Sequence, residues 1–203
     1  MMAGHPNETS PLGLRNIGFS LQVGELDSGY QRNEIAAQWQ DKLSELKAED
    51  PEGYRHLVEI HPGKGHWMDR EDAKAIPWMS EFTRNPFPDR IVWKQDDVTH
   101  PRFYWLAIDK EHEKSGAEVR ASMNGQEILI ESSDVSEIIV RANDAMLDLD
   151  RPVTIRCGEE VIFEGTIPRK IATIAKTLEE RGDPESIYCG EQKVKLPQNV
   201  GRD

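Results

Sequence analysis

The sequence lacks the features of membrane, secreted and disulfide-rich proteins. It has no run of about 18 apolar residues that could form a transmembrane helix. Its first ten residues are polar and lack the apolar core of a secretory signal. The two cysteines, Cys157 and Cys189, do not form a Cys-x-x-Cys motif and allow one disulfide at most. These absences predict a cytoplasmic protein by default, with a core that is held by packing.

Basic residues are scarce relative to acidic ones. The chain has 25 Lys and Arg against 37 Asp and Glu, which gives a net charge of −12. Nucleic-acid phosphates and anionic membranes both select for Lys and Arg patches, so neither is expected as a partner. The acidity is typical of a solvated surface that keeps a protein soluble.

The first half of the chain predicts a strand, a helix and a second strand. Residues 17–23 form a short apolar run between glycines, as in a buried parallel strand, and residues 56–60 form another. Between them, the segment 33–47 has a helical apolar face made of Ile35, Trp39, Leu43 and Leu46. This order predicts a right-handed βαβ unit.

A second helix is expected after His66. Asp69 can cap it, and an apolar face would then consist of Ala73, Ile76, Met79 and Phe82. Pro77 lies within this pattern, so the helix either kinks there or restarts with Pro77 in its first turn.

Beyond residues 84–86 the sequence changes to short β-rich runs. They lie at residues 91–94, 102–108, 118–123, 127–131, 137–141, 153–157, 161–167 and 187–194. Asn124-Gly125 is a strong hairpin signal and Gly158-Glu159 a weaker one. Many short, closely spaced strands predict a small antiparallel sandwich.

One helix interrupts these strands. Ile171, Ile174, Ala175 and Leu178 share a helical face, and Gly182 is expected to end the helix. The predicted fold is therefore α/β followed by mainly β. Residues 1–87 form the α/β part, and residues 88–203 form a β-sandwich-like accessory domain.

Two candidate functional residues follow the two predicted parallel strands. Asp27 comes after the first strand, and His66 lies in the glycine-flanked loop after the second. Loops at the carboxyl ends of neighbouring parallel strands meet at one sheet edge. A carboxylate there can accept a hydrogen bond from imidazole Nδ1–H and fix the tautomer. Taken singly, Asp27 could instead be a turn or capping residue, and His66 a surface histidine.

A metal site is the weaker interpretation of the same segment. His61, His66 and Asp69 lie close in sequence, but His61 and His66 have a loop spacing, and no third strong ligand lies nearby. His61 is expected to be a strand-end residue that shapes the loop. No metal and no cofactor are predicted.

Several segments resemble the C-terminal half of bacterial α/β-hydrolases. They are residues 3–7 (AGHPN), 14–16 (LRN), 24–27 (GELD) with 30–33 (YQRN), and 61–68 (HPGKGHWM). The similarity is greatest to prolyl oligopeptidase-like and dienelactone hydrolase-like esterases or peptidases. Residues 76–79 (IPWM), 93–97 (WKQDD) and 103–106 (FYWL) look like a subgroup with an additional C-terminal β-domain.

The resemblance implies that Asp27 is the acid and His66 the general base of a Ser-His-Asp triad. The sequence contains no Gly-x-Ser-x-Gly elbow, and Ser10, Ser20 and Ser28 do not stand in one. We therefore expect the C-terminal portion of a serine hydrolase, whose partner is an N-terminal hydrolase half or a second copy of the chain. Its substrate would be a small ester or peptide. The alternative is a non-catalytic binding or structural module, or an inactive truncated hydrolase fragment.

Overall fold

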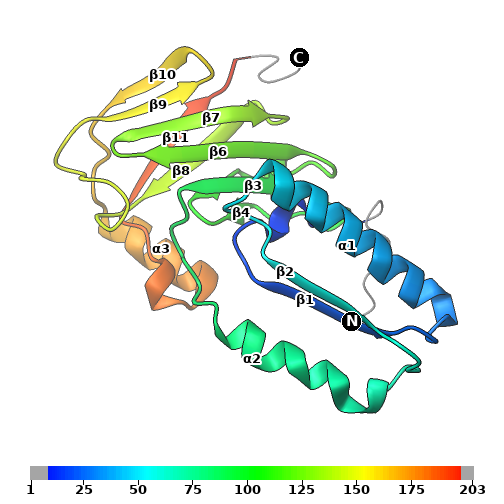
Figure 1. Cartoon of the computed structure of the whole chain (residues 1–203). Coiled ribbons are helices and arrows are strands. Elements are labelled where there is room, and N and C mark those ends of the chain that lie inside the picture. Colours follow the sequence, from blue (N-terminus) through cyan, green and yellow to red (C-terminus); the bar gives the residue numbers. More distant parts are fainter. Residues whose placement is uncertain (1–8, 198–203) are drawn as a thin grey trace. The chain divides into compact units, whose positions relative to one another are not determined.

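The computed structural model describes residues 9–197, which fold into two compact units that divide between Asn85 and Pro86. We call the residues up to Asn85 unit 1 and those from Pro86 onward unit 2 (Figure 1). Helices and strands are both present, strands predominate, and they belong to three sheets. No helix in the described residues is long and apolar enough to cross a membrane.

Unit 1 contains a two-stranded parallel sheet and the helix that connects its strands. The strands are β1 (Phe19–Gly24) and β2 (His56–His61), and the helix is α1 (Arg32–Glu49). The pairing runs in register from Phe19 opposite His56 to Gly24 opposite His61. Helix α1 lies along one side of the strands and the segment containing α2 along the other (Figure 1). The short 3₁₀ segments of this unit are η1 (Pro11–Leu14), η2 (Gly29–Gln31) and η3 (Met68–Lys74).

The core of unit 1 is small and is centred on α1. Trp39 and Leu43 are buried, and the Trp39 ring stacks on Phe19 with their centroids 5.5 Å apart. Ile35 is partly buried against this core. Helix α1 ends beside Asp50, whose carboxylate accepts two hydrogen bonds, of 2.7 and 3.1 Å, from the Arg15 guanidinium.

The helix expected after His66 differs from its prediction. It is a 3₁₀ segment, η3, followed by the short α2 (Ala75–Ser80), in which Pro77 lies in the first turn. Asp69 is not a cap, because its φ of 52° places it inside a left-handed stretch. Ile76 and Met79 are 70% and 50% exposed, and Ala73 is exposed too. The apolar spacing assumed a continuous α-helix, and the interruption rotates those side chains outward.

Unit 2 contains two sheets. One has the strand order β10-β9-β7-β6-β3, and the other has the order β11-β8-β5-β4. The strands are β3 (Arg90–Lys94), β4 (Arg102–Phe103), β5 (Leu106–Ala107), β6 (Glu118–Asn124), β7 (Glu127–Ser133), β8 (Glu137–Ala142), β9 (Val153–Cys157), β10 (Glu160–Gly165) and β11 (Gly190–Lys195). Two further 3₁₀ segments are η4 (Lys110–His112) and η5 (Pro184–Ser186).

Both sheets contribute to one hydrophobic core. Fully buried side chains include Ile128 and Ile155 from the first sheet and Ile138 and Val140 from the second. Trp105 is also fully buried, and its Nε1–H donates to the Pro88 carbonyl at 2.8 Å. This shared core accounts for the alternating apolar residues along the strands.

Two features of unit 2 correct the sequence-based expectations. The two-residue turns at Gly125 and Gly158 close hairpins as expected, with both glycines at positive φ. However, β7 and β9 pair in parallel, so the sheet is not antiparallel throughout. The chain leaves this sheet through β8 and returns, so β9 runs in the same direction as β7. The run 102–108 is not one strand, because Tyr104 at φ 51° reverses the chain between β4 and β5.

Helix α3 (Ile171–Arg181) buries a different face from the one predicted. It ends at Gly182, which adopts φ 62° as expected. Thr173 and Thr177 are buried, whereas Ile171 is 85% exposed. The Thr177 hydroxyl donates to the Thr173 carbonyl at 2.9 Å and accepts from the Tyr188 N–H at 3.1 Å. Because its hydrogen bonds are made, the threonine can be buried at little cost. Cys157 and Cys189 are both free thiols.

We predict that unit 1 opens more readily than unit 2. Among the described residues its core has 7 buried residues against 23 in unit 2, and each strand of its two-stranded sheet has one unpaired edge. In hydrogen exchange of the dilute monomeric chain, amides of residues 19–23 should exchange faster than those of residues 153–157. Equal protection of the two segments would contradict this prediction and would argue that unit 1 is a self-sufficient fold.

Candidate active site

Asp27 and His66 lie together at the carboxyl edge of the β1–β2 sheet. Asp27 is in the loop after β1, and His66 is in the loop after β2. Because the strands are parallel and Gly24 is opposite His61, both loops leave the sheet at the same edge. His66 Nδ1 is 2.7 Å from Asp27 Oδ2. The structure therefore brings the two candidate residues into direct hydrogen-bond contact.

Three further hydrogen bonds fix the two loops to each other. The Glu25 N–H donates to the His61 carbonyl at 3.0 Å, and the Leu26 N–H donates to the Lys64 carbonyl at 2.8 Å. The Gly63 N–H donates to Glu25 Oε2 at 2.7 Å. These bonds join the backbone just before Asp27 to the backbone just before His66, so the two loops are held together independently of the Asp27–His66 hydrogen bond.

Gly24 permits this close approach of the loops. A Cβ at Gly24 would overlap the carbonyl oxygens of Lys64 and Gly65 well inside van der Waals contact. The second loop therefore passes directly over the end of β1, and only glycine fits there.

The Asp27 carboxylate is held in its ionised form. It is buried, at 7% exposure, and its second oxygen, Oδ1, accepts from Arg32 at 2.7 Å. The hydrogen bond from His66 lowers the pKa of Asp27 most, and the Arg32 guanidinium lowers it further, against the opposing effect of burial. Arg32 itself lies over the Tyr30 ring, 5.2 Å from its centroid.

The ionised carboxylate determines the tautomer of His66. An acceptor facing Nδ1 requires a proton there, which leaves a lone pair on Nε2 of the neutral ring. The His66 side chain is 54% exposed, and Nε2 has no hydrogen-bond partner within residues 9–197. The Trp67 ring meets the imidazole edge-on at 5.1 Å. The arrangement provides a base that is oriented, accessible and able to stabilise a positive charge when it takes a proton.

Large apolar side chains stand in solvent beside this pair. Leu26, Tyr30 and Trp67 are 65%, 77% and 83% exposed and are sequence neighbours of the pair or of Arg32. Exposed apolar side chains that gather at one place mark a surface for a ligand or a partner.

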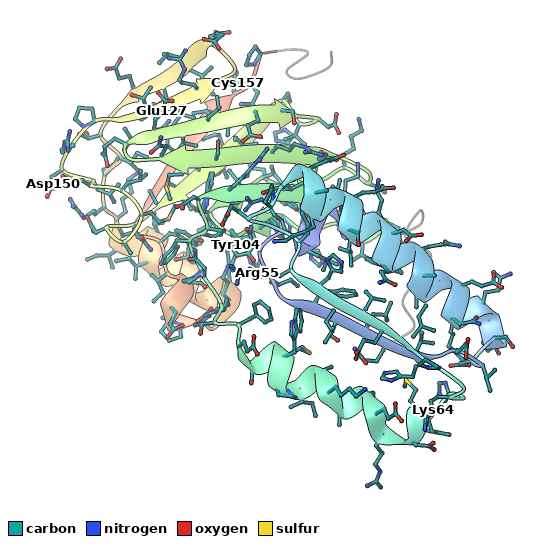
Figure 2. All side chains as sticks on the ribbon, viewed as in Figure 1. Arg55, Lys64, Tyr104, Glu127, Asp150 and Cys157 are labelled. Atoms are coloured by element: carbon teal, nitrogen blue, oxygen red, sulfur yellow. The ribbon has the colours of Figure 1, made fainter. Side chains whose placement is uncertain are left out.

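The other residues considered for a metal site have separate partners. His61 is buried, with Nε2 at 2.8 Å from Gln22 Oε1 and Nδ1 at 3.4 Å from Glu71. Asp69 pairs with Lys64 at 2.9 Å (Lys64 is labelled in Figure 2). His61 thus shapes the strand end, and the three residues His61, His66 and Asp69 are not assembled around a common point.

A different trio has the spacing of a metal site. In the described part of the chain, ligand atoms of Asp109, His112 and Glu137 lie within 4.8 Å of one another. However, the Lys193 ammonium is 2.5 Å from Asp109 and 3.1 Å from Glu137. Since the Lys193 ammonium already contacts both carboxylates and would repel a cation placed between them, we assign no metal to this trio.

Arg32 and Gln22 are site residues that sequence reasoning missed. Arg32 follows Asp27 by five residues at the start of α1, and a cation just beyond the candidate acid was the available signal. Gln22 had no such signal, because its partner His61 is brought to it by the strand pairing.

The three serines that the sequence offered near the pair lie just before η1 (Ser10), on β1 (Ser20) and directly after Asp27 (Ser28). The Ser20 hydroxyl, on β1, donates to the Leu57 carbonyl at 3.1 Å. No serine hydroxyl within residues 9–197 hydrogen bonds to His66.

Comparison with known proteins gave no match: no protein-family model, no curated protein and no solved structure is significantly similar to this chain.

Replacing Gly24 with alanine should displace the loop that carries His66. We expect a loss of about 1–3 kcal/mol in the unfolding free energy of unit 1, the usual cost of overpacking. The measurement is a urea titration followed through backbone amide resonances of β1 and β2. Gly65→Ala is the matched control, because a Cβ there meets nothing within 4 Å and should leave stability within about 0.5 kcal/mol. Equal effects of the two substitutions would refute the close approach.

Asp27 should stabilise unit 1 in a pH-dependent way. Its pKa is lower in the folded chain than the usual value of about 3.9, so folding favours the ionised form. The resulting stability is present above about pH 4 and is lost as the pH falls through the folded pKa. The stability difference between the parent chain and Asp27→Asn should therefore be largest near pH 7 and shrink in acid. Asp72→Asn, which removes an exposed carboxylate of the same unit, is the control, and a pH-independent difference for Asp27→Asn would contradict the prediction.

Proposed function

We propose that this chain supplies the acid and the general base of a serine hydrolase. Asp27 orients His66, and His66 Nε2 takes the proton of a serine that lies outside these 203 residues. The observation that supports this most is the 2.7 Å contact between His66 Nδ1 and a buried, ionised carboxylate, in a histidine whose side chain is 54% exposed.

The chemistry of the pair suits acyl transfer. His66 would accept the serine proton as the hydroxyl attacks a carbonyl carbon, and would then return it to the leaving alcohol or amine. Asp27 would stabilise the imidazolium formed in between. The substrate class is a carboxylic ester or a peptide bond, in line with the resemblance of residues 24–27, 30–33 and 61–68 to esterases and peptidases of the α/β-hydrolase fold.

Under this proposal, the 203 residues are one part of a larger catalytic assembly. The N-terminal half of such a hydrolase would carry the nucleophile elbow and the oxyanion hole, either in a longer form of this protein or as a separate chain. The two-stranded sheet of unit 1 would then be the last βαβ unit of a larger parallel sheet, and the unit 2 sheets an accessory domain.

The test is active-site labelling in the native organism, where the protein is expressed from its own gene. A fluorophosphonate probe should label a serine in a Gly-x-Ser-x-Gly segment outside these 203 residues, as read by mass spectrometry of the labelled peptide. His66→Ala should abolish labelling, and Asp27→Asn should slow turnover about 10⁴-fold, because asparagine no longer holds the required tautomer. His100→Ala is the control, since that exposed histidine is hydrogen bonded through its backbone.

Two results would overturn the proposal. One is labelling of a serine within residues 1–203, which would place the nucleophile in this chain. The other is labelling that His66→Ala leaves unchanged, which would favour a non-catalytic role for the pair. The 203-residue chain expressed alone should show no labelled serine.

A further inference from the structure

Unit 2 contains a groove between α3 and the four-stranded sheet. Two adjoining cavities, of about 190 and 400 Å³, form it and share Asp109, Ile139 and Lys176 in their walls. The smaller one extends toward Arg102 on β4, and the larger one toward Lys193 on β11. We call this the α3 groove. All of its lining residues belong to unit 2.

The α3 groove is basic although the chain as a whole is acidic. Its acidic lining residues are Asp109, Glu180 and Glu191, and Glu137 adds a fourth carboxylate by pairing with Lys193. Its cationic lining residues are Arg102, Lys110, Arg141, Lys170, Lys176 and Lys193. Cations thus outnumber acids here in a chain of net charge −12, and such a local reversal of sign attracts anions.

Most of these cations are already ion-paired. Arg141, only 3% exposed, binds Glu180 through two hydrogen bonds of 2.7 and 3.0 Å and Glu191 through one of 3.0 Å. Lys176 pairs with Glu191 at 3.0 Å, and Lys193 pairs with Asp109. These pairs stiffen the walls and largely cancel their own charges.

In the part of the chain that the structure describes, the unpaired positive charges of the groove belong to Lys110 and Lys170. Within residues 9–197, neither ammonium group has an ion pair or a hydrogen bond to a side chain or carbonyl. Lys110 lines the smaller cavity and Lys170 the larger one. Ile139 lines both cavities and is the apolar residue that they share.

We propose that the α3 groove binds an elongated dianion, with one anionic group at Lys110, the other at Lys170 and an apolar or neutral middle over Ile139. The anionic groups are carboxylates or phosphates, since an ammonium group binds either as a point charge. This site is independent of the Asp27–His66 pair and of the hydrolase proposal.

The experiment is isothermal titration calorimetry of the full chain with defined probes. Adipate tests the dicarboxylate, and 1,6-hexanediol bis(methyl phosphate), a diester that also carries two negative charges, tests the bisphosphate, in a phosphate-free buffer of low ionic strength. 1,6-Hexanediol and hexanoate are the neutral and singly charged references. One or both dianions should bind more tightly than hexanoate, hexanediol should not bind, and the tighter dianion identifies the anionic group. Binding should weaken as salt is added, because exposed charges are screened.

Variants locate the site. Lys110→Gln and Lys170→Gln should each weaken dianion binding about threefold, and the double variant about tenfold, the range expected for exposed charge pairs. Arg151→Gln is the matched control, because it removes one exposed cation of unit 2 outside the groove. Circular dichroism checks that each variant is folded. The proposal is overturned if no dianion binds, if hexanoate binds as tightly, or if Arg151→Gln weakens binding as much as the lysine variants do.

Discussion

The parallel pairing of β1 with β2 is the constraint on which the candidate site depends. Its register ends with Gly24 opposite His61, so the two following loops begin side by side. Backbone hydrogen bonds then join these loops, and the absence of a side chain at Gly24 lets them touch. A one-residue slip would exchange the faces of β2 and separate Asp27 from His66. The main chain therefore brings Asp27 and His66 together, and the hydrogen bond between their side chains stabilises that arrangement further.

The sequence predicts those residues of the site whose positions follow from the order of the strands. Asp27 and His66 could be identified because residues after consecutive parallel strands meet at one edge. Arg32 gave a weaker signal, because a cation five residues after Asp27 indicates a partner only once α1 is known to begin there and to turn Arg32 back toward Asp27. His61 was expected to shape the strand end, but its bond to Gln22 requires the register of two strands to be known.

The buried faces of the helices after His66 were the least predictable features, for a physical reason. Apolar spacing assumes an uninterrupted α-helix whose hydrophobic side faces the core. In α3 the buried side chains are Thr173 and Thr177, whose hydroxyls can be satisfied by backbone groups, whereas Ile171 stays in solvent. After His66 a left-handed stretch precedes α2 and changes which residues face inward. Hairpins were more predictable, because Gly125 and Gly158 supply the positive φ that a tight turn needs.

The left-handed stretch Met68–Asp69–Arg70 directly follows the loop that carries His66 and has a strained backbone. Three consecutive non-glycine residues have φ values of 48°, 52° and 67°, a conformation that costs about 1–3 kcal/mol per residue. Lys64 spans this stretch by pairing with Asp69 and Glu71 at 2.9 and 3.0 Å. Ionic strength therefore acts on both loops: screening weakens the Lys64 ion pairs beside the imidazole and the Arg32 ion pair of the Asp27 carboxylate, while the backbone hydrogen bonds between the loops persist.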